Sequence, residues 1–143
     1  DNPLLTTRTY HGKSPVRVVL GNVSKLTSEF NIFNDQAPTW IYNTSSAKHL
    51  SFSRRGTEQI DLKPFNLSGM FEDLAKRGIG KVLVEGGKEL LDSIIKEGLW
   101  DEAYVIVGNN TFDNGLPAPL IPGIIVDHNK VGEDDWYNYF RKC

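Results

Sequence analysis

The chain has 143 residues and a mass of 16.1 kDa, which is the length of one ordinary domain with a sizeable core. A formal net charge of −2 and a pI near 5.9 give no sign of a general binding surface for nucleic acid or anionic lipid, and no apolar run approaches the roughly 18 residues that a membrane-spanning helix needs. The single cysteine, Cys143, excludes an internal disulfide framework and a Cys-rich zinc site. We therefore expect one globular domain in a reducing compartment, by default the cytoplasm.

The first half of the chain predicts short strands. Residues 16–20 form a β-branched run that ends at Gly21, which is typical of a buried strand entering a turn. A second strand is expected at 40–42, and two further short strands at 49–53 and 60–62.

Helical spacing then replaces the strand pattern. Met70, Phe71 and Leu74 recur at intervals of a helical turn. Ser68 can cap this helix at its start, and Gly78 can end it.

A strand with an all-apolar interior is expected at 81–85, and it leads through Gly86 and Gly87 into a second helix that Gly98 closes. The apolar face of this helix consists of Leu90, Leu91, Ile94 and Ile95.

The last third of the chain predicts strands. Residues 103–107 form a near-continuous apolar strand, and 124–126 and 136–140 favour an antiparallel pair because no helix separates them. Helices that alternate with strands imply a sheet covered by helices. We expect an α/β fold whose mixed, mostly parallel sheet is flanked by helices and ends in antiparallel strands.

The diglycine turn at Gly86 and Gly87 suits an anion. Glycine lets the backbone approach a ligand without a Cβ, and the N–H groups of a first helical turn attract phosphate. Glu85 stands at the carboxyl end of the expected strand, where open α/β sheets place ligands. The alternative is a tight strand-to-helix connection beside a solvated carboxylate, because the spacing is neither that of a P-loop nor that of a dinucleotide fingerprint.

The N-terminal sequence D-N-P-L-L-T-T-R is the second candidate. Pro3 fixes an extended or turn conformation, and Arg8 offers a planar guanidinium that matches a phosphate or carboxylate. The alternative is a frayed terminus with a solvated Arg8. His11, His49 and His128 lack the spacing of metal ligands, so no metal site is expected.

Together these segments resemble a known family. The matching motifs are D-x-P-x-L-T-x-R at 1–8, S-P-V-R-V-V-L at 14–20, V-E-G-G at 84–87 and G-L-W-D-E at 98–102. In order and separation they resemble the reductase domain of the bifunctional riboflavin-biosynthesis deaminase/reductase. The resemblance implies a dihydrofolate reductase-like fold and an NADPH-dependent enzyme that reduces 5-amino-6-(5-phosphoribosylamino)uracil to its phosphoribitylamino product.

The resemblance also implies site residues. Leu5, Arg8 and Glu85 match substrate-contacting positions, and Arg8 would bind the 5′-phosphate. Cofactor-contacting positions are matched by Asp1, Asn22, Gly87, Lys88, Glu89, Leu90, Leu91, Asp92 and Ser93. The backbone at the helix start would receive the NADPH pyrophosphate, while no residue is assigned as the general acid. The expected partners are the phosphorylated ribosylaminopyrimidine substrate and a second copy in a homodimer, without nucleic acid or membrane.

Two parts of the family pattern are missing. The H-x-E and P-C-x-x-C zinc signature of the deaminase half is absent, so deamination is not expected of this chain. The strand and helix that precede the D-x-P segment in the family are absent as well. Residues 1–143 are therefore expected to be a reductase domain truncated at its N-terminus, part of a longer protein and by itself an incomplete catalyst.

Two other functions stay open. One is a non-catalytic scaffold or oligomerisation module, favoured by the aromatic residues Trp136, Tyr137, Tyr139 and Phe140, because exposed aromatic strands form interfaces. The other is a stand-alone reductase of the 2,5-diaminopyrimidinone phosphate.

Overall fold

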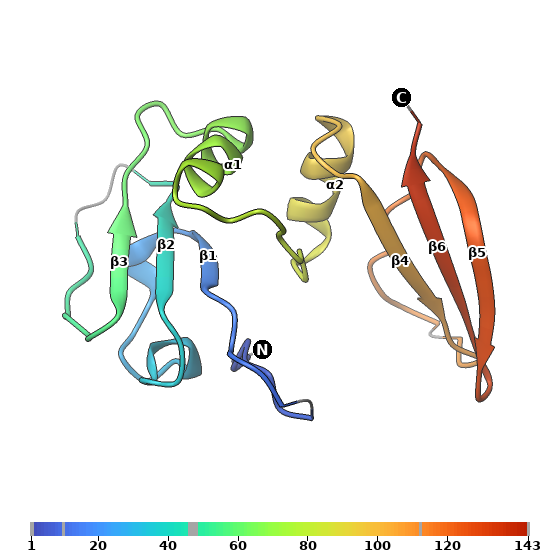
Figure 1. Ribbon diagram of the computed structural model, residues 1–143, viewed down its shortest axis with the longest axis horizontal. Coiled ribbons are helices and arrows are strands. Elements are labelled where there is room, and N and C mark those ends of the chain that lie inside the picture. The colour runs from blue at the N-terminus through green and yellow to red at the C-terminus, as the bar shows by residue number, and fades with distance from the viewer. Residues whose placement is uncertain (1, 10, 46–48, 112, 143) are drawn as a thin grey trace. The chain divides into compact units, whose positions relative to one another are not determined.

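The computed structural model describes residues 2–9, 11–45, 49–111 and 113–142. The chain forms two compact units, Asp1–Gly78 and Ile79–Cys143, each with its own three-stranded sheet (Figure 1). The first sheet is parallel and the second antiparallel, which confirms the α/β class and the antiparallel C-terminal strands. The strands of the expected mixed sheet are hydrogen-bonded in these two groups within the described residues. Within the described part of the chain, no helix is long and apolar enough to cross a membrane.

The first unit is built on a parallel sheet of order β1-β2-β3. Its strands are β1 (Arg17–Gly21), β2 (Thr39–Asn43) and β3 (Thr57–Ile60). Val19 lies opposite Ile41, and Ile41 lies opposite Gln59. The predictions of β1 and β2 are confirmed. β3 starts earlier than predicted, because its sequence TEQI is mostly polar and gives no strand pattern, and the strand depends on pairing with β2.

Two short 3-10 helices, η1 (Val23–Lys25) and η2 (Asn31–Phe33), connect β1 to β2. Together with β2 they form a core cluster of Val23, Ile32, Phe33 and Ile41. The predicted strand at 49–53 is wrong, although Leu50 and Phe52 pack against this cluster as the alternating pattern requires. The backbone N–H of Leu50 donates to the side chain of Gln59 at 2.8 Å and forms no strand ladder.

Helix α1 (Leu67–Lys76) covers the parallel sheet (Figure 1). It begins earlier than predicted because Asn66, not Ser68, caps it by accepting a hydrogen bond from the N–H of Gly69 at 2.7 Å. Gly78, with a φ of 84°, follows its end as predicted. The helix buries Leu67, Met70 and Leu74.

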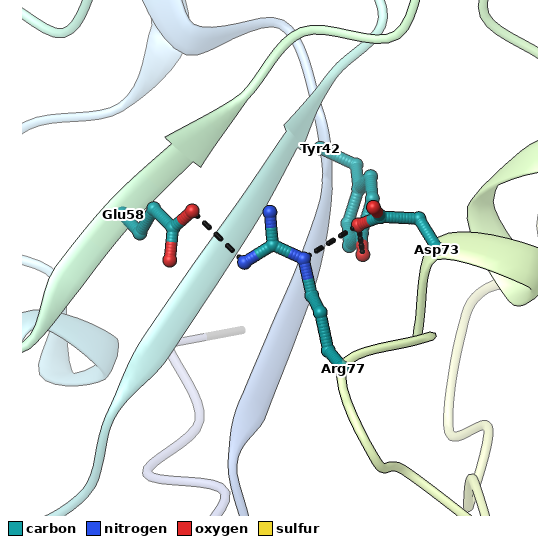
Figure 2. Close-up of polar contacts among 4 residues, drawn as sticks. All are labelled: Tyr42, Glu58, Asp73 and Arg77. Carbon is teal, nitrogen blue, oxygen red and sulfur yellow. Dashed lines mark hydrogen bonds and ion pairs between the residues drawn. The ribbon is translucent and has the colours of Figure 1, made fainter. Parts of the chain in front are cut away.

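A polar network fixes α1 to β2 and β3 (Figure 2). The hydroxyl of buried Tyr42 donates to Asp73 at 2.7 Å, and Arg77 donates from Nε to the same carboxylate oxygen at 2.7 Å. Arg77 also pairs with Glu58 at 2.9 Å and lies 5.1 Å from the centre of the Trp40 ring. The helix is therefore held by directional bonds as well as by its apolar face.

The second unit consists of one helix and an antiparallel sheet of order β4-β6-β5. Its elements are α2 (Lys88–Lys96), β4 (Glu102–Val107), β5 (Gly123–Val131) and β6 (Asp134–Arg141). The predicted helix, the strand at 103–107 and the C-terminal antiparallel pair are confirmed. Gly132, with a φ of 65°, turns β5 into β6.

The predicted strand at 81–85 is wrong. Val82 is 36% exposed and Leu83 is 76% exposed. A strand needs a neighbour for its ladder hydrogen bonds, and among the described strands none pairs with this segment. Its apolar sequence therefore remains an extended connection into α2.

Candidate functional site

The N-terminal segment lies on the core of the first unit. Leu5 is half-buried and packs against the cluster of Val23, Ile32, Phe33 and Ile41. Its φ of 50° lies in the left-handed region, which residues with a Cβ seldom adopt. Arg8 is exposed. Asp1, the expected cofactor contact that precedes them, lies outside the described residues.

Polar side chains gather where the three parallel strands end. Asn22 follows β1, Asn43 ends β2 with Ser45 two residues on, and Asp61 follows β3. We call these four residues the polar edge. Because parallel strands present their carboxyl ends at the same side of a sheet, the polar edge occupies the position where open α/β sheets bind ligands.

Hydrogen bonds connect the members of the polar edge. The Oδ1 of Asn22 accepts from the hydroxyl of Ser45 at 3.0 Å, and the amide of Asn43 donates to Asp61 at 2.9 Å. Gln59 donates to the other oxygen of Asp61 at 2.9 Å. The hydrogen bond from Asn43, followed by that from Gln59, holds the pKa of Asp61 below its usual range. Asp61 is therefore an anion near neutral pH and an acceptor for hydroxyl groups.

An open pocket of about 320 Å³ adjoins the polar edge. It is lined by Asn43, Thr44, Ser45, Asp61, Leu62, Lys63, Pro64 and Phe65. Of the polar edge, only Asn22 was a candidate from the sequence, and Asn43, Ser45 and Asp61 were not. The signal that could have found them is their shared position at the ends of consecutive parallel strands.

In the second unit, Gly87 caps the start of α2. Its carbonyl accepts from the N–H groups of Leu90 at 3.1 Å and Leu91 at 3.2 Å, and within the described residues no side chain caps the helix. A Cβ built on Gly87 would meet nothing within 4 Å. The first turn of α2 is thus left accessible to an anion.

The side chains of the predicted cofactor run are partly engaged within α2 itself. Lys88 pairs with Asp92 at 2.9 Å, and the hydroxyl of Ser93 donates to the carbonyl of Glu89 at 2.8 Å. Leu90 and Leu91 are half-buried, while Glu85, just before the glycines, is exposed. Any anion held here would therefore meet mainly backbone N–H groups.

These features describe an α/β protein with candidate ligand-binding residues in both units. The first unit holds the polar edge at the carboxyl ends of its strands and the N-terminal segment, which Arg17 contacts at the start of β1. The second unit holds the glycine-capped helix. The chain belongs to the family of the RibD C-terminal domain, whose model matches residues 1–112.

Curated relatives carry two kinds of name. The chain is 30% identical over 119 residues to the riboflavin biosynthesis protein RibD of Aquifex aeolicus, covering 81% of this chain and 33% of that protein. It is 32% identical over 135 residues to the 2,5-diamino-6-ribosylamino-4(3H)-pyrimidinone 5′-phosphate reductase of Methanothermobacter thermautotrophicus, covering 86% and 56%. The chain thus spans a third to just over half of the length of these relatives.

Solved structures share the fold. The deaminase/5-amino-6-(5-phosphoribosylamino)uracil reductase of Thermotoga maritima superposes with a TM-score of 0.82 at 21% identity, over 99% of this chain and 42% of that one. The family and the fold expected from the sequence motifs are thereby confirmed.

Proposed function

We propose that this chain carries the reductase function of riboflavin biosynthesis, with 5-amino-6-(5-phosphoribosylamino)uracil as substrate and NADPH as hydride donor. The observation that carries the proposal is the family match over residues 1–112, which includes both the N-terminal segment and the diglycine turn. When bound, NADPH would supply the hydride that C1′ of the sugar receives as its bond to the ring oxygen breaks, and a proton from solvent would complete the hydroxyl of the opened ribityl chain.

The fit of the cofactor rests on the start of α2. The backbone at Gly87 faces open space, and the helix has no side-chain cap among the described residues, so its first-turn N–H groups can donate to a pyrophosphate. In the first unit, taken by itself, the polar edge offers amide, hydroxyl and carboxylate groups that can form hydrogen bonds with hydroxyl groups of a ligand.

On the substrate side, Arg8 would bind the 5′-phosphate with its guanidinium, and Leu5 would pack against the pyrimidine or ribose. Glu85, exposed before the diglycine turn, would accept hydrogen bonds from the ribose hydroxyls or the base. Placing the carbon that receives the hydride is the main catalytic contribution of such a site.

A second substrate is favoured by the relative from Methanothermobacter thermautotrophicus, whose name specifies the 2,5-diaminopyrimidinone phosphate. The intact protein should be offered NADPH with each pyrimidine in turn, and oxidation of NADPH should be followed. We expect turnover with the deaminated uracil compound to be faster. Faster turnover of the diamino compound would reassign the substrate, and absence of turnover with both would contradict a reductase.

The same assay tests whether Arg8 binds the 5′-phosphate of the pyrimidine substrate. Arg8→Ala should raise the KM for the pyrimidine by on the order of tenfold, the effect of losing one charge-assisted hydrogen bond. Arg55→Ala, an exposed arginine of the same unit, is the matched control. Equal KM values in the two variants would exclude Arg8 from the phosphate site.

We also propose that the antiparallel sheet pairs two copies of the protein. One face of the sheet carries Ile106 opposite Trp136, and Phe140 opposite Ile124, with Tyr104 in the same row. These residues are 41% to 64% exposed, which is unusual for large apolar side chains that neighbour one another. A twofold axis would bury the same face on both copies, as in most homodimers.

Sedimentation tests this pairing. Ile106→Glu should weaken dimerisation by about tenfold or more, because it places a charge on the apolar face, opposite Trp136. Leu116→Glu, which changes an 84% exposed loop residue, should leave it unchanged. A monomer at all concentrations of the unaltered protein would overturn the proposal.

A further inference from the structure

Asn2 and Asn31 form a reciprocal pair that ties the N-terminal segment to η2. The side-chain oxygen of Asn2 accepts from the backbone N–H of Asn31 at 2.7 Å, and the side-chain amide of Asn31 donates to the carbonyl of Asn2 at 2.7 Å. Both residues are exposed, so the pair adds little to the core. Its effect is to fix the backbone of residue 2 against a loop that lies 29 positions further along the chain.

The buried side chain of Arg17 forms hydrogen bonds with the same two segments. Its side chain is 2% exposed, and its Nη1 donates to the carbonyls of Asn31 at 3.2 Å and Leu4 at 3.4 Å. Its remaining bonds go to the side chain and carbonyl of Asn34, at 2.8 and 2.7 Å, and to the carbonyl of Ala37. A buried guanidinium that serves carbonyls of separate segments fixes their relative position.

Leu5 lies immediately after the tethered carbonyl of Leu4, and its left-handed φ of 50° is unfavourable for a residue with a Cβ. Such a conformation persists only where its surroundings enforce it, and it is found preferentially at functional sites. Contacts on both sides enforce it here: the bonds to residues 2 and 4 before it, and the packing of the Leu5 side chain on the core cluster.

We propose that Asn31 and Arg17 are positioning residues that hold the N-terminal segment in its substrate-binding conformation. The proposal rests on the reductase function above, in which Leu5 and Arg8 contact the pyrimidine phosphate. The two residues touch no reacting atom and act through Asn2 and Leu4. A segment ordered before the substrate arrives binds it more tightly than one that must be ordered by the substrate.

The test uses Asn31→Asp in the intact protein, because Asn31 is exposed and the substitution keeps the size of the side chain while removing the donor to Asn2. The KM for 5-amino-6-(5-phosphoribosylamino)uracil should rise by about two- to tenfold, the equivalent of one neutral hydrogen bond, with kcat retained within about twofold. Hydrogen exchange of the amides at 4–8 should become faster without substrate. The control is Gln36→Ala, an exposed amide of the same loop whose bond to Asn34 runs through its backbone N–H.

Asn2→Ala provides the second arm. It removes the other bond of the pair, from the backbone N–H of Asn31 to the side chain of Asn2, and should raise the KM similarly. The double variant should raise the KM by less than the product of the two single effects, because both bonds fix the same segment. An unchanged KM overturns the proposal. A higher KM also overturns it if kcat and thermal stability fall to the same extent, both measured relative to the control Gln36→Ala. If the unaltered protein turns over no pyrimidine, the proposed reductase function is wrong. Hydrogen exchange then tests the positioning role by itself. Unchanged exchange at 4–8 in Asn31→Asp would overturn that role, and faster exchange would support it.

Discussion

Gly86 and Gly87 are neighbours in the sequence, but a methyl group added to each would meet different surroundings. At Gly86 a Cβ would lie 2.6 Å from the Cδ2 of Leu90 and 3.2 Å from its Cβ, whereas at Gly87 it would meet nothing within 4 Å. The φ of Gly87 is −67°, which alanine adopts without strain. Packing thus accounts for the first glycine, whereas no neighbouring atom among the described residues requires a glycine at the second.

This contrast gives a matched pair of variants. Gly86→Ala should lower the free energy of unfolding by about 1 kcal/mol, because Leu90 must move. Gly87→Ala should change stability little but weaken NADPH binding on the order of tenfold, because the Cβ blocks close approach of the pyrophosphate. Thermal unfolding and calorimetry with NADPH measure the two effects. Unaltered NADPH affinity in Gly87→Ala would remove the pyrophosphate from this turn.

At the scale of residues, the sequence pointed to a candidate site residue only where that residue stands in a recognisable motif. Arg8 and Gly87 stand in motifs whose residue types suit an anion contact, although a solvated arginine and a tight connection remained the alternatives. The carboxylate of Asp61 does not, because its role depends on Asn43 and on β3, a strand whose sequence has only one large apolar residue. The left-handed backbone of Leu5 is likewise set by distant contacts and not by its own residue type.

At the scale of elements, α1 is attached to its sheet by the network of Figure 2, and this network titrates. The hydrogen bond from Tyr42, together with the one from Arg77, holds the pKa of Asp73 below its usual range. Burial, followed by the bond to Asp73, raises the pKa of Tyr42. The contribution of Asp73 is present above its unfolded pKa of about 3.9 and is lost as the pH falls through its lower folded pKa. That of Tyr42 is lost as the pH rises above its unfolded pKa of about 10.

Asp73→Asn tests this attachment. Near neutral pH it should cost about 1 kcal/mol of unfolding free energy, since it replaces two charge-assisted hydrogen bonds by weaker ones. In acid the difference from the unaltered protein should shrink, because protonation of Asp73 removes the same charge. Urea unfolding near neutral pH and in acid measures this, with Glu72→Gln on the same helix as the control. An equal cost at both pH values would show that the charge of Asp73 does not stabilise the fold.

Elements with a helical period or a continuous apolar run were predictable from the sequence, whereas the polar strand β3 and the unpaired segment 81–85 were not. The apolar face of α2 and the runs of β1 and β4 identify themselves by period and length. Residues 81–85 have the composition of a buried strand, but composition cannot supply the neighbouring strand that a ladder requires, and the segment is unpaired among the described strands.

At the scale of the whole molecule, the resemblance of the motifs to a family predicted more of the fold than hydrophobic periodicity did. Composition and spacing alone left the diglycine turn as an ordinary connection, whereas the order of four motifs along the chain pointed to the family that the match over residues 1–112 confirms. Motif order reports common ancestry, and ancestry preserves a fold whose pairings the local sequence does not specify. The division into two sheets was not predictable in this way.

Transfer of hydride to the sugar is the central claim, and isotope transfer tests it most directly. The intact protein should be incubated with 5-amino-6-(5-phosphoribosylamino)uracil and NADPH deuterated at the transferable position of C4, and the pyrimidine product analysed by mass spectrometry and NMR. The account predicts a phosphoribitylamino product with a single deuterium at C1′. A product without deuterium, or a substrate recovered unchanged while NADPH demonstrably binds, would contradict it.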